Sequence, residues 1–247
     1  ASPSKELEKE LKDLMRQWGR KFDEYAVHRS RWFAKRVNTS TTNQLKGALK
    51  DAGLTVKFRN SRRVNNMYQA TVAENVNLIK TIPQQYLSNV NTIVMQSVRN
   101  GRDMGFSAKQ IQEQYGKSKA RAITIARDQT NKATEAVSQA RAADIGITHG
   151  FWIHRGGGKI PRSTHEGFNG QRFELAKGLY DPQAWKKKGG GYVGQWVKPA
   201  ELINCHCTFK LDLSTITGNG VATDSKKRGA VLVKFASGST VEYAKAA

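Results

Sequence analysis

The stretch "SKARAITIARDQTNKATEAVSQARAADIG", residues 118–146, marks the point at which the character of this 247-residue chain changes. Its small and apolar residues recur at three- and four-residue steps, which is the period of an amphipathic helix. The face that they form favours close packing of one helix on another, and it comprises Ala122, Ile125, Ala126, Thr130, Ala133, Val137, Ala140 and Ala143. The helical period stops at Gly146, so we expect a helix to end there and a different kind of structure to follow.

Upstream of this stretch the sequence is periodic almost throughout. Helical patterns cover residues 4–36, 41–52, 59–82, 83–101 and 107–116. Gly53 is a suitable C-terminal cap, and Pro83 is expected to stop one helix and to open the next, because proline is favoured in a first turn. Residues 54–58 alternate and predict a short strand or an extended connector. The first 146 residues are therefore predicted to be almost wholly α-helical.

Downstream of Gly146, glycines become frequent and aromatic residues alternate with polar ones. Residues 147–213 predict a compact, loop-rich β module with short strands at 148–154, 171–175 and 206–213. After Ser214 a polar linker leads to two alternating runs around Ser237 and Gly238, a hairpin signal. The expected fold class is α+β: a long helical N-terminal part, a small β module and a C-terminal β-hairpin tail. The expected domains are an N-terminal helical region (1–80), a second helical part (81–146), the β module (147–213) and a basic linker with the hairpin (214–247).

Both cysteines of the chain lie in "NCHCTF", residues 204–209. Zinc is held by four ligands, commonly thiolates and imidazoles, with two ligands from each of two loops. Cys205 and Cys207 supply one such pair, and His165 and His154 are the candidates for the other, whereas His206 is expected to point to the opposite face if the segment is extended. One structural zinc ion is thus a candidate cofactor. The alternative is a pair of reduced, buried thiols, since free cysteine behaves as a small hydrophobe.

The chain is strongly basic, with 41 Lys and Arg against 20 Asp and Glu and a formal net charge of +21. Such a charge favours a polyanionic partner, above all nucleic acid, because neutralising phosphates releases condensed counterions. A charge that only confers solubility is the alternative. Lys186–Lys188 stand between Trp185 and two further aromatic residues, a pattern that suits stacking and phosphate contacts, although a solvated loop fits it as well. The candidate DNA-binding residues are Arg59, Arg62, Arg63, Lys186, Lys187, Lys188, Lys226, Lys227 and Arg228.

Catalytic signatures are weak. No nucleophile motif surrounds the cysteines, and the segment 156–163 lacks the spacing of a phosphate-binding loop. The acidic residues Glu166, Glu174 and Asp181 suggest a metal-dependent nuclease only loosely, because no pair has a characteristic spacing. A host DNA-binding protein is a further alternative, but this chain lacks any recognition-helix or zinc-finger spacing that would support it. We therefore expect no enzyme, no catalytic residue and no membrane span, since no apolar run approaches the ~20 residues that a spanning helix needs. Two cysteines without an export signal indicate a reducing compartment.

Five pieces of this sequence, taken in order, resemble the phage Mu F-like minor head proteins, also called the phage head morphogenesis family. They are the helix "RAITIAR" (Arg121 to Arg127), Arg141 with "DIGI", Trp152, the "R-x-x-H-x-x-x-x-G" stretch from Arg162 to Gly170, and the closing C-x-C. Together they cover residues 80–210. Many relatives have C-x-x-C where this chain has residues 162–165, and C-R-C at the close. Arg162 and His206 depart from that pattern, which excludes a four-cysteine site and keeps His165, Cys205 and Cys207 as matched candidates.

The resemblance implies a structural component of a tailed bacteriophage. Such a protein would be attached to the portal at the DNA vertex inside the head, and would be present in the bacterial host cytoplasm during assembly. The implied partners are the portal protein, viral double-stranded DNA bound without sequence preference, and other head or ejected proteins. The implied role lies in head assembly, genome packaging or genome delivery. The alternative function is a small metal-dependent nuclease or effector enzyme acting on nucleic acid.

Overall fold

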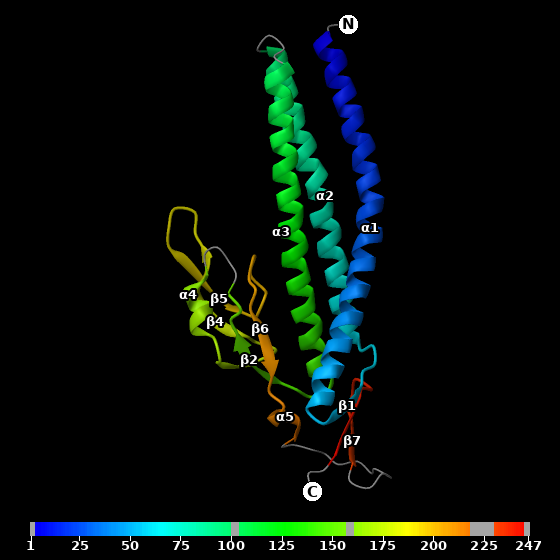
Figure 1. The fold of residues 1–247 in the computed structure, drawn as a ribbon, viewed down its shortest axis with the longest axis vertical. Coiled ribbons are helices and arrows are strands. Elements are labelled where there is room, and N and C mark those ends of the chain that lie inside the picture. Colours follow the sequence, from blue (N-terminus) through cyan, green and yellow to red (C-terminus); the bar gives the residue numbers. More distant parts are fainter. Residues whose placement is uncertain (1–2, 100–103, 157–160, 218–229, 245–247) are drawn as a thin grey trace. The chain divides into compact units, whose positions relative to one another are not determined.

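The structure is a computed structural model that describes residues 3–99, 104–156, 161–217 and 230–244. Three long helices come first: α1 (Pro3–Asp51), α2 (Arg62–Arg99) and α3 (Met104–Asp144). A short strand, β1 (Leu54–Lys57), separates the first two. The described residues after α3 form short strands and single helical turns joined by loops, coloured from green to red in Figure 1. The α+β prediction is confirmed.

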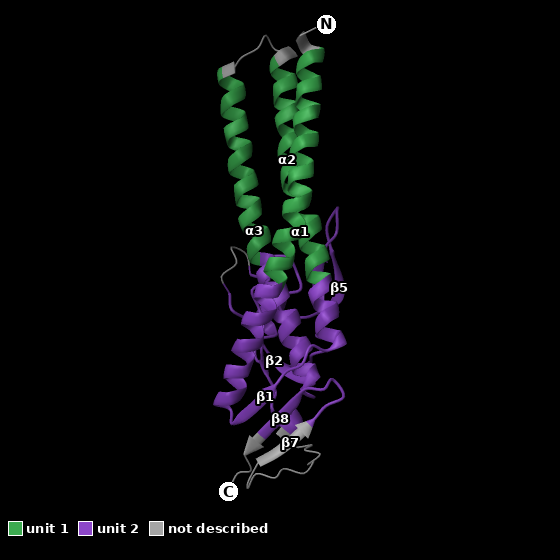
Figure 2. Cartoon of the chain, turned by 90° about the vertical axis from the view of Figure 1, so that its right-hand side faces the viewer, with its two compact units in different colours: residues 1–34, 70–127 green, residues 35–69, 128–247 purple. Residues whose placement is uncertain are grey.

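The chain divides into two compact units, coloured separately in Figure 2. The first consists of residues 1–34 and 70–127, and its described residues belong to the three long helices. Polar contacts join these segments: Lys80 Nζ lies 3.0 Å from Asp23 Oδ1, and Asn89 donates to Gln114 Oε1 over 3.1 Å. Arg121, one of the residues that carried the family resemblance, donates to Thr81 Oγ1 over 3.0 Å. Arg121 therefore acts as a tie between α2 and α3.

The second unit, residues 35–69 and 128–247, holds the main hydrophobic core. Its first sheet has the order β3-β2-β6, in which β2 (His149–Ile153) pairs antiparallel with β3 (Arg172–Glu174) and with β6 (Thr208–Leu211). Trp152 of β2 is fully buried. The helical turn α4 (Ser163–Gly167) precedes β3 in the sequence, and the helical turn α5 (Ser214–Thr217) follows β6. This sheet carries the segments that build the candidate site.

A second sheet joins residues far apart in the chain. Its order is β1-β8-β7, with β7 (Ala230–Lys234) and β8 (Thr240–Ala244) forming the hairpin that the alternating C-terminal runs predicted. β1 pairs antiparallel with β8, so residues 54–57 are a strand and not an extended connector. Gly146, which follows α3, has a φ of 75°. A Cβ atom there would lie 2.7 Å from the ring of Phe235, so the break at Gly146 serves both the backbone turn and this close approach.

Several predicted helix boundaries are wrong. We expected a break near residue 40, but α1 continues because its buried face continues at helical spacing through Ala34, Val37, Thr41, Leu45 and Leu49. Likewise, the break expected near Gly116 is absent, and α3 is one helix.

Pro83 is the third correction. It lies buried inside α2 and does not start a new helix. Proline removes one backbone hydrogen bond and often kinks a helix, yet the helix continues on both sides of it. The periodic residues before and after Pro83 are helical as predicted, and only the prediction that Pro83 ends one helix and starts the next is wrong.

One element of the fold was not predicted from the sequence. The hairpin of β4 (Leu179–Lys186) and β5 (Tyr192–Val197) lies where we expected mainly a basic loop. Its register shifts between Asp181 and Trp185, so burial along β4 does not alternate regularly. An irregular strand of this kind gives no period-two signal in the sequence.

Candidate metal centre

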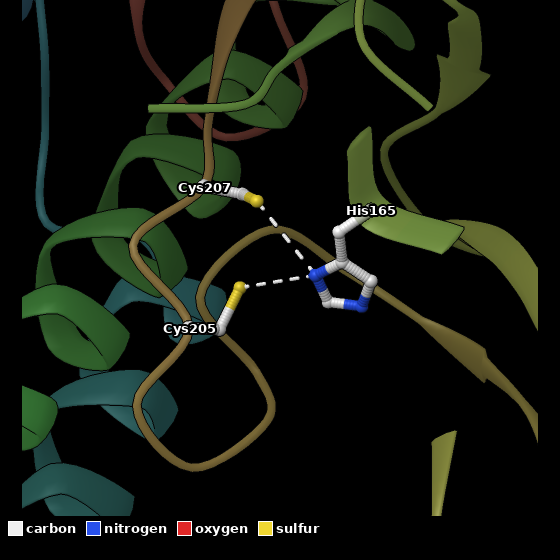
Figure 3. A group of neighbouring side chains, drawn as sticks. All are labelled: His165, Cys205 and Cys207. Atoms are coloured by element: carbon white, nitrogen blue, oxygen red, sulfur yellow. Dashed lines mark hydrogen bonds between the residues drawn. The ribbon is translucent and has the colours of Figure 1, made fainter. Parts of the chain in front are cut away.

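His165, Cys205 and Cys207 meet in the interior of the second unit (Figure 3). Their side chains are only 2%, 3% and 4% exposed, and one ligand atom from each lies within 4.8 Å of the others. His165 Nδ1 is 3.4 Å from Cys205 Sγ and 3.7 Å from Cys207 Sγ. The three residues that the sequence matched to the family motif are therefore brought together.

The two ligand segments are tied to each other and to α3. Arg162, directly before α4, donates through Nη2 to the carbonyl oxygen of Ile203 over 3.1 Å. Asn204 has a left-handed backbone with a φ of 57°, and its amide donates to Asp128 Oδ1 on α3 over 2.8 Å. The Cys205 amide donates to the carbonyl oxygen of Leu202 over 3.0 Å, which closes a turn. These contacts fix the direction in which both thiols point.

A buried carboxylate holds the other side of the imidazole. Asp181 on β4 is fully buried, and its Oδ2 lies 3.2 Å from His165 Nε2. Its Oδ1 accepts the Gln183 amide over 2.8 Å. When Nε2 carries the proton, Nδ1 presents a lone pair to the two sulfurs, which is the state required of a metal ligand. In the sequence Asp181 is one of several scattered acidic residues, and nothing there indicates this positioning role.

Aromatic rings enclose the imidazole. The ring centroid of Trp152 lies 5.2 Å from that of His165 in an edge-to-face arrangement, and Phe168 stacks on His165 at 5.7 Å. The site is thus dry on these sides, and its ligand atoms are held by packing as well as by hydrogen bonds.

His154, the fourth candidate ligand, lies beside the cluster without joining it fully. Its Nδ1 is 3.5 Å from Cys207 Sγ, and its backbone amide donates to Asn169 Oδ1 over 2.9 Å. It does not belong to the group of mutually close ligand atoms found among the described residues. His206 lies outside that group too, as expected.

The donor set fits zinc. With zinc–sulfur bonds of about 2.3 Å and zinc–nitrogen bonds of about 2.0–2.1 Å, tetrahedral geometry separates a sulfur from a nitrogen by roughly 3.6 Å. The two distances from His165 Nδ1 to the cysteine sulfurs are 3.4 and 3.7 Å, and His154 Nδ1, outside the group of mutually close ligand atoms, is 3.5 Å from Cys207 Sγ. The interaction between the two thiols lowers the pKa of Cys205 and raises the pKa of Cys207. A lowered thiol pKa favours the thiolate, the form that binds metal.

A second buried acid lies next to the cysteine segment. Glu135 on α3 accepts a hydrogen bond from the hydroxyl of Thr208, the residue after Cys207. Burial raises the pKa of Glu135 to about 7, against the lowering effect of the Thr208 bond. The sequence placed Glu135 on a helix but gave no sign that it would be buried.

The candidate DNA-binding residues that the structure describes form two separate clusters. Arg59, Arg62 and Arg63 lie at and just before the start of α2, where Arg62 and Arg63 line a surface hollow of about 590 Å³. Arg141, buried on α3, holds this segment by donating to the carbonyl oxygen of Arg59 over 2.5 Å, and burial lowers its pKa.

The lysines form a second cluster. Lys186–Lys188 are exposed at the turn of the β4–β5 hairpin, where the amide of Lys187 donates to the carbonyl oxygen of Gly191 over 3.0 Å. Tyr192 and Trp196 of the same hairpin are also exposed. Lys226, Lys227 and Arg228 lie outside the described residues.

Comparison with known proteins identifies the family of this chain. A family model described as "Phage Mu protein F like protein" matches residues 88–210, a range that contains the whole cluster and the ties that hold it. Through these residues the chain belongs to the phage Mu F-like family, which indicates a phage head morphogenesis protein. The family predicted from the sequence is confirmed.

One relative is a protein of Haemophilus influenzae (strain ATCC 51907 / DSM 11121 / KW20 / Rd) described as "Uncharacterized protein". It is 36% identical over 171 residues, which are 69% of this chain and 34% of the relative. The chain therefore spans about a third of the length of that relative. No solved structure gives a significant match. Within the described residues, the helices lack the combination of length and apolar character that crossing a membrane requires.

Proposed function

We propose that the chain is a structural minor head protein that contacts the portal and the packaged double-stranded DNA, and that acts in head assembly, genome packaging or delivery without catalysis. The observation that carries this proposal is the family match over residues 88–210, which includes the complete His–Cys cluster. The net charge of +21 supports a position beside DNA. The exposed lysines of the β4–β5 turn offer one contact surface for phosphates.

The experiment is fractionation of purified particles, with detection of the chain alongside the portal protein. We expect the chain in the particle, and we expect it to co-purify with the portal after the head is opened. Its affinity for DNA should fall steeply with salt, in the manner of non-specific phosphate binding. Particles that lack the chain, while it accumulates free in the host, would contradict the proposal.

A structural zinc ion is the second part of the proposal. His165, Cys205 and Cys207 would hold it, with His154 as the candidate fourth ligand. Bound zinc would pin the cysteine segment to α4, and the burial of the ligands favours a closed structural site over a catalytic one, which keeps an open position. Elemental analysis of the purified chain should give roughly one zinc per chain.

Point variants test the ligand assignment. His165→Ala, Cys205→Ser and Cys207→Ser should each abolish stoichiometric zinc, and His154→Ala should weaken its retention against a chelator. His206→Ala is the matched control and should keep the metal. Metal-free protein whose two thiols react readily under native conditions would reject the zinc site in favour of two packed thiols.

The alternative function, a small metal-dependent nuclease or effector, is disfavoured by the burial of His165 and Asp181, which keeps these two groups away from a substrate. A nuclease assay with added zinc, magnesium or manganese distinguishes the two. Activity that His165→Ala abolishes would overturn the non-catalytic proposal.

A further inference from the structure

The first helix carries a row of large apolar side chains that are about half exposed in the part of the chain that the structure describes. Leu14, Trp18, Tyr25 and Trp32 of α1 are 41%, 42%, 49% and 54% exposed. Steps of four and seven residues separate them, so they lie along one line on the helix. Together with Leu7 and Leu11 they follow a 3.5-residue period, the repeat of a coiled-coil seam. We call the residues from Leu7 to Trp32 on this line the α1 stripe.

The α1 stripe differs from the face by which α1 packs within its own chain. That second face is marked by the buried residues Ala26, Ser30 and Ala34. From Lys5 to Tyr25 the helix has no buried residue. Because most helix stability in proteins comes from burying an apolar face, this half of α1 is poorly stabilised by its own chain.

Cations lie within the stripe and not only beside it. Lys21 Nζ is 5.0 Å from the ring centroid of Trp18. The Arg29 guanidinium is 5.3 Å from the ring of Tyr25 and 6.0 Å from that of Trp32. A partner for this surface must therefore accept aromatic rings and positive charge at the same positions.

We propose that the α1 stripe binds the same stripe of a second copy of this chain, with the two helices antiparallel. In the register that places Leu14 opposite the partner's Tyr25, Leu7 meets the partner's Trp32. The same register places Leu11 opposite the partner's His28. Every layer then joins an apolar or aromatic residue from one copy to a ring from the other or to Lys21.

Charge complementarity fixes the orientation. In this register Glu8 lies beside the partner's Arg29, and Glu10 lies beside the partner's Arg31, at the flanking positions whose ion pairs set orientation in coiled coils. Glu8 also pairs with Lys12 of its own helix over 2.6 Å, and a carboxylate can accept both donors. The two-fold relation repeats each pair, which gives four pairs in the dimer.

The parallel orientation lacks these matches. It would place Lys21 directly opposite the partner's Lys21, which is repulsive. In the antiparallel register Lys21 faces the partner's Trp18 instead, and a lysine over an indole ring is attractive. The interface therefore selects an antiparallel second copy.

Reciprocal charge reversal tests the proposal on the full chain. Sedimentation over a concentration series should show a dimer for the wild type. Glu8→Arg with Glu10→Arg should weaken dimerisation by at least roughly tenfold, as should Arg29→Glu with Arg31→Glu, because four flanking pairs become repulsive. A mixture of the two double variants should restore a heterodimer, since every flanking pair is then attractive.

Arg16→Glu with Arg20→Glu is the matched control, since these exposed residues lie off the stripe, and it should leave dimerisation unchanged. Circular dichroism checks that each variant keeps its helix content. A wild type that stays monomeric at all concentrations, or a mixture that fails to restore pairing, would overturn the proposal.

Cysteine cross-linking tests the orientation separately. Leu14→Cys mixed with Tyr25→Cys should form an interchain disulfide on mild oxidation, whereas Leu14→Cys alone should not. The wild-type chain, with its buried native thiols, gives the background. Cross-linking of Leu14→Cys alone would show a parallel pair and would sink the antiparallel assignment.

Discussion

Asp181 Oδ2 lies 3.2 Å from His165 Nε2, with both side chains buried. Among the described residues neither atom makes a hydrogen bond of regular geometry, so each is the close polar neighbour of the other. The carboxylate and the imidazole therefore depend on each other, and the contact keeps the opposite ring nitrogen directed at the two cysteines.

Removing this charge should loosen the metal centre without removing a ligand. We expect Asp181→Asn to lower zinc affinity by about 10- to 100-fold, the usual effect of losing the partner of a metal-binding histidine. Competition with a chromogenic chelator measures it. Glu174→Gln removes an exposed carboxylate from the neighbouring sheet and should leave the affinity unchanged. Equal affinities for Asp181→Asn and the wild type would show that Asp181 does not orient the ligand.

Glu135 gives the fold a pH dependence. Its pKa is raised to about 7 by burial, so the folded state binds a proton more tightly than the unfolded state, whose pKa is near 4.5. Its favourable contribution is complete below pH 4.5 and is lost as the pH rises through 7. The loss is on the order of 3 kcal/mol. Urea unfolding of Glu135→Gln between pH 5 and 8, about the range of this titration, should give a flatter stability profile than the wild type. Parallel profiles for the two proteins would contradict this account.

Asn204 and Asp128 shape the cysteine turn. Left-handed backbone costs roughly 1–2 kcal/mol for most residues, least for glycine and asparagine. Asn204→Ala should therefore lower the free energy of unfolding by about 1 kcal/mol, whereas Asn204→Gly should be nearly neutral. Asp128→Ala leaves the Asn204 amide without its acceptor and should cost about 1–3 kcal/mol. Chemical denaturation checks all three, and an Asn204→Gly variant as unstable as Asn204→Ala would argue against a backbone cause.

The hairpin lysines should contribute directly to DNA binding. Alanine at Lys186, Lys187 and Lys188 should weaken binding to duplex DNA and reduce the salt slope of log K by up to about 3, since each lost phosphate contact removes about 0.9. Fluorescence anisotropy at several salt concentrations measures both quantities. A control with alanine at Lys5, Lys9 and Lys46 removes the same charge from exposed helical positions and should change the slope less. Equal changes in the two triple variants would indicate binding by overall charge alone.

Much of the fold was predictable because its helices and its C-terminal strands have regular repeats of apolar residues over short stretches of sequence. The 3.6-residue pattern of α3 ends at Gly146, and the alternating C-terminal runs form β7 and β8. The helix break predicted at Pro83 is wrong because a proline shows only a local tendency to interrupt a helix, whereas α2 continues on both sides of it. The β4–β5 hairpin was missed because its register shift breaks the alternation on which strand prediction depends.

The residues of the candidate site also include some that the sequence predicts and some that it does not. His165, Cys205 and Cys207 could be named because their types and order are typical of a metal site. Asp181, Glu135 and Asp128 could not, because a lone acidic residue in a sequence carries no sign of what it will face. Their roles arise only when β4 and α3 bring them to the cluster.

Forty residues separate His165 from Cys205. A metal bound by both would close that segment into a loop, so tension applied to the two ends of the chain would pass through the metal centre and bypass residues 166–204. The hairpin with its lysines would stay folded under a pull that unravels the helices. Rupture of the cluster would then release about 140 Å of hidden chain in one step.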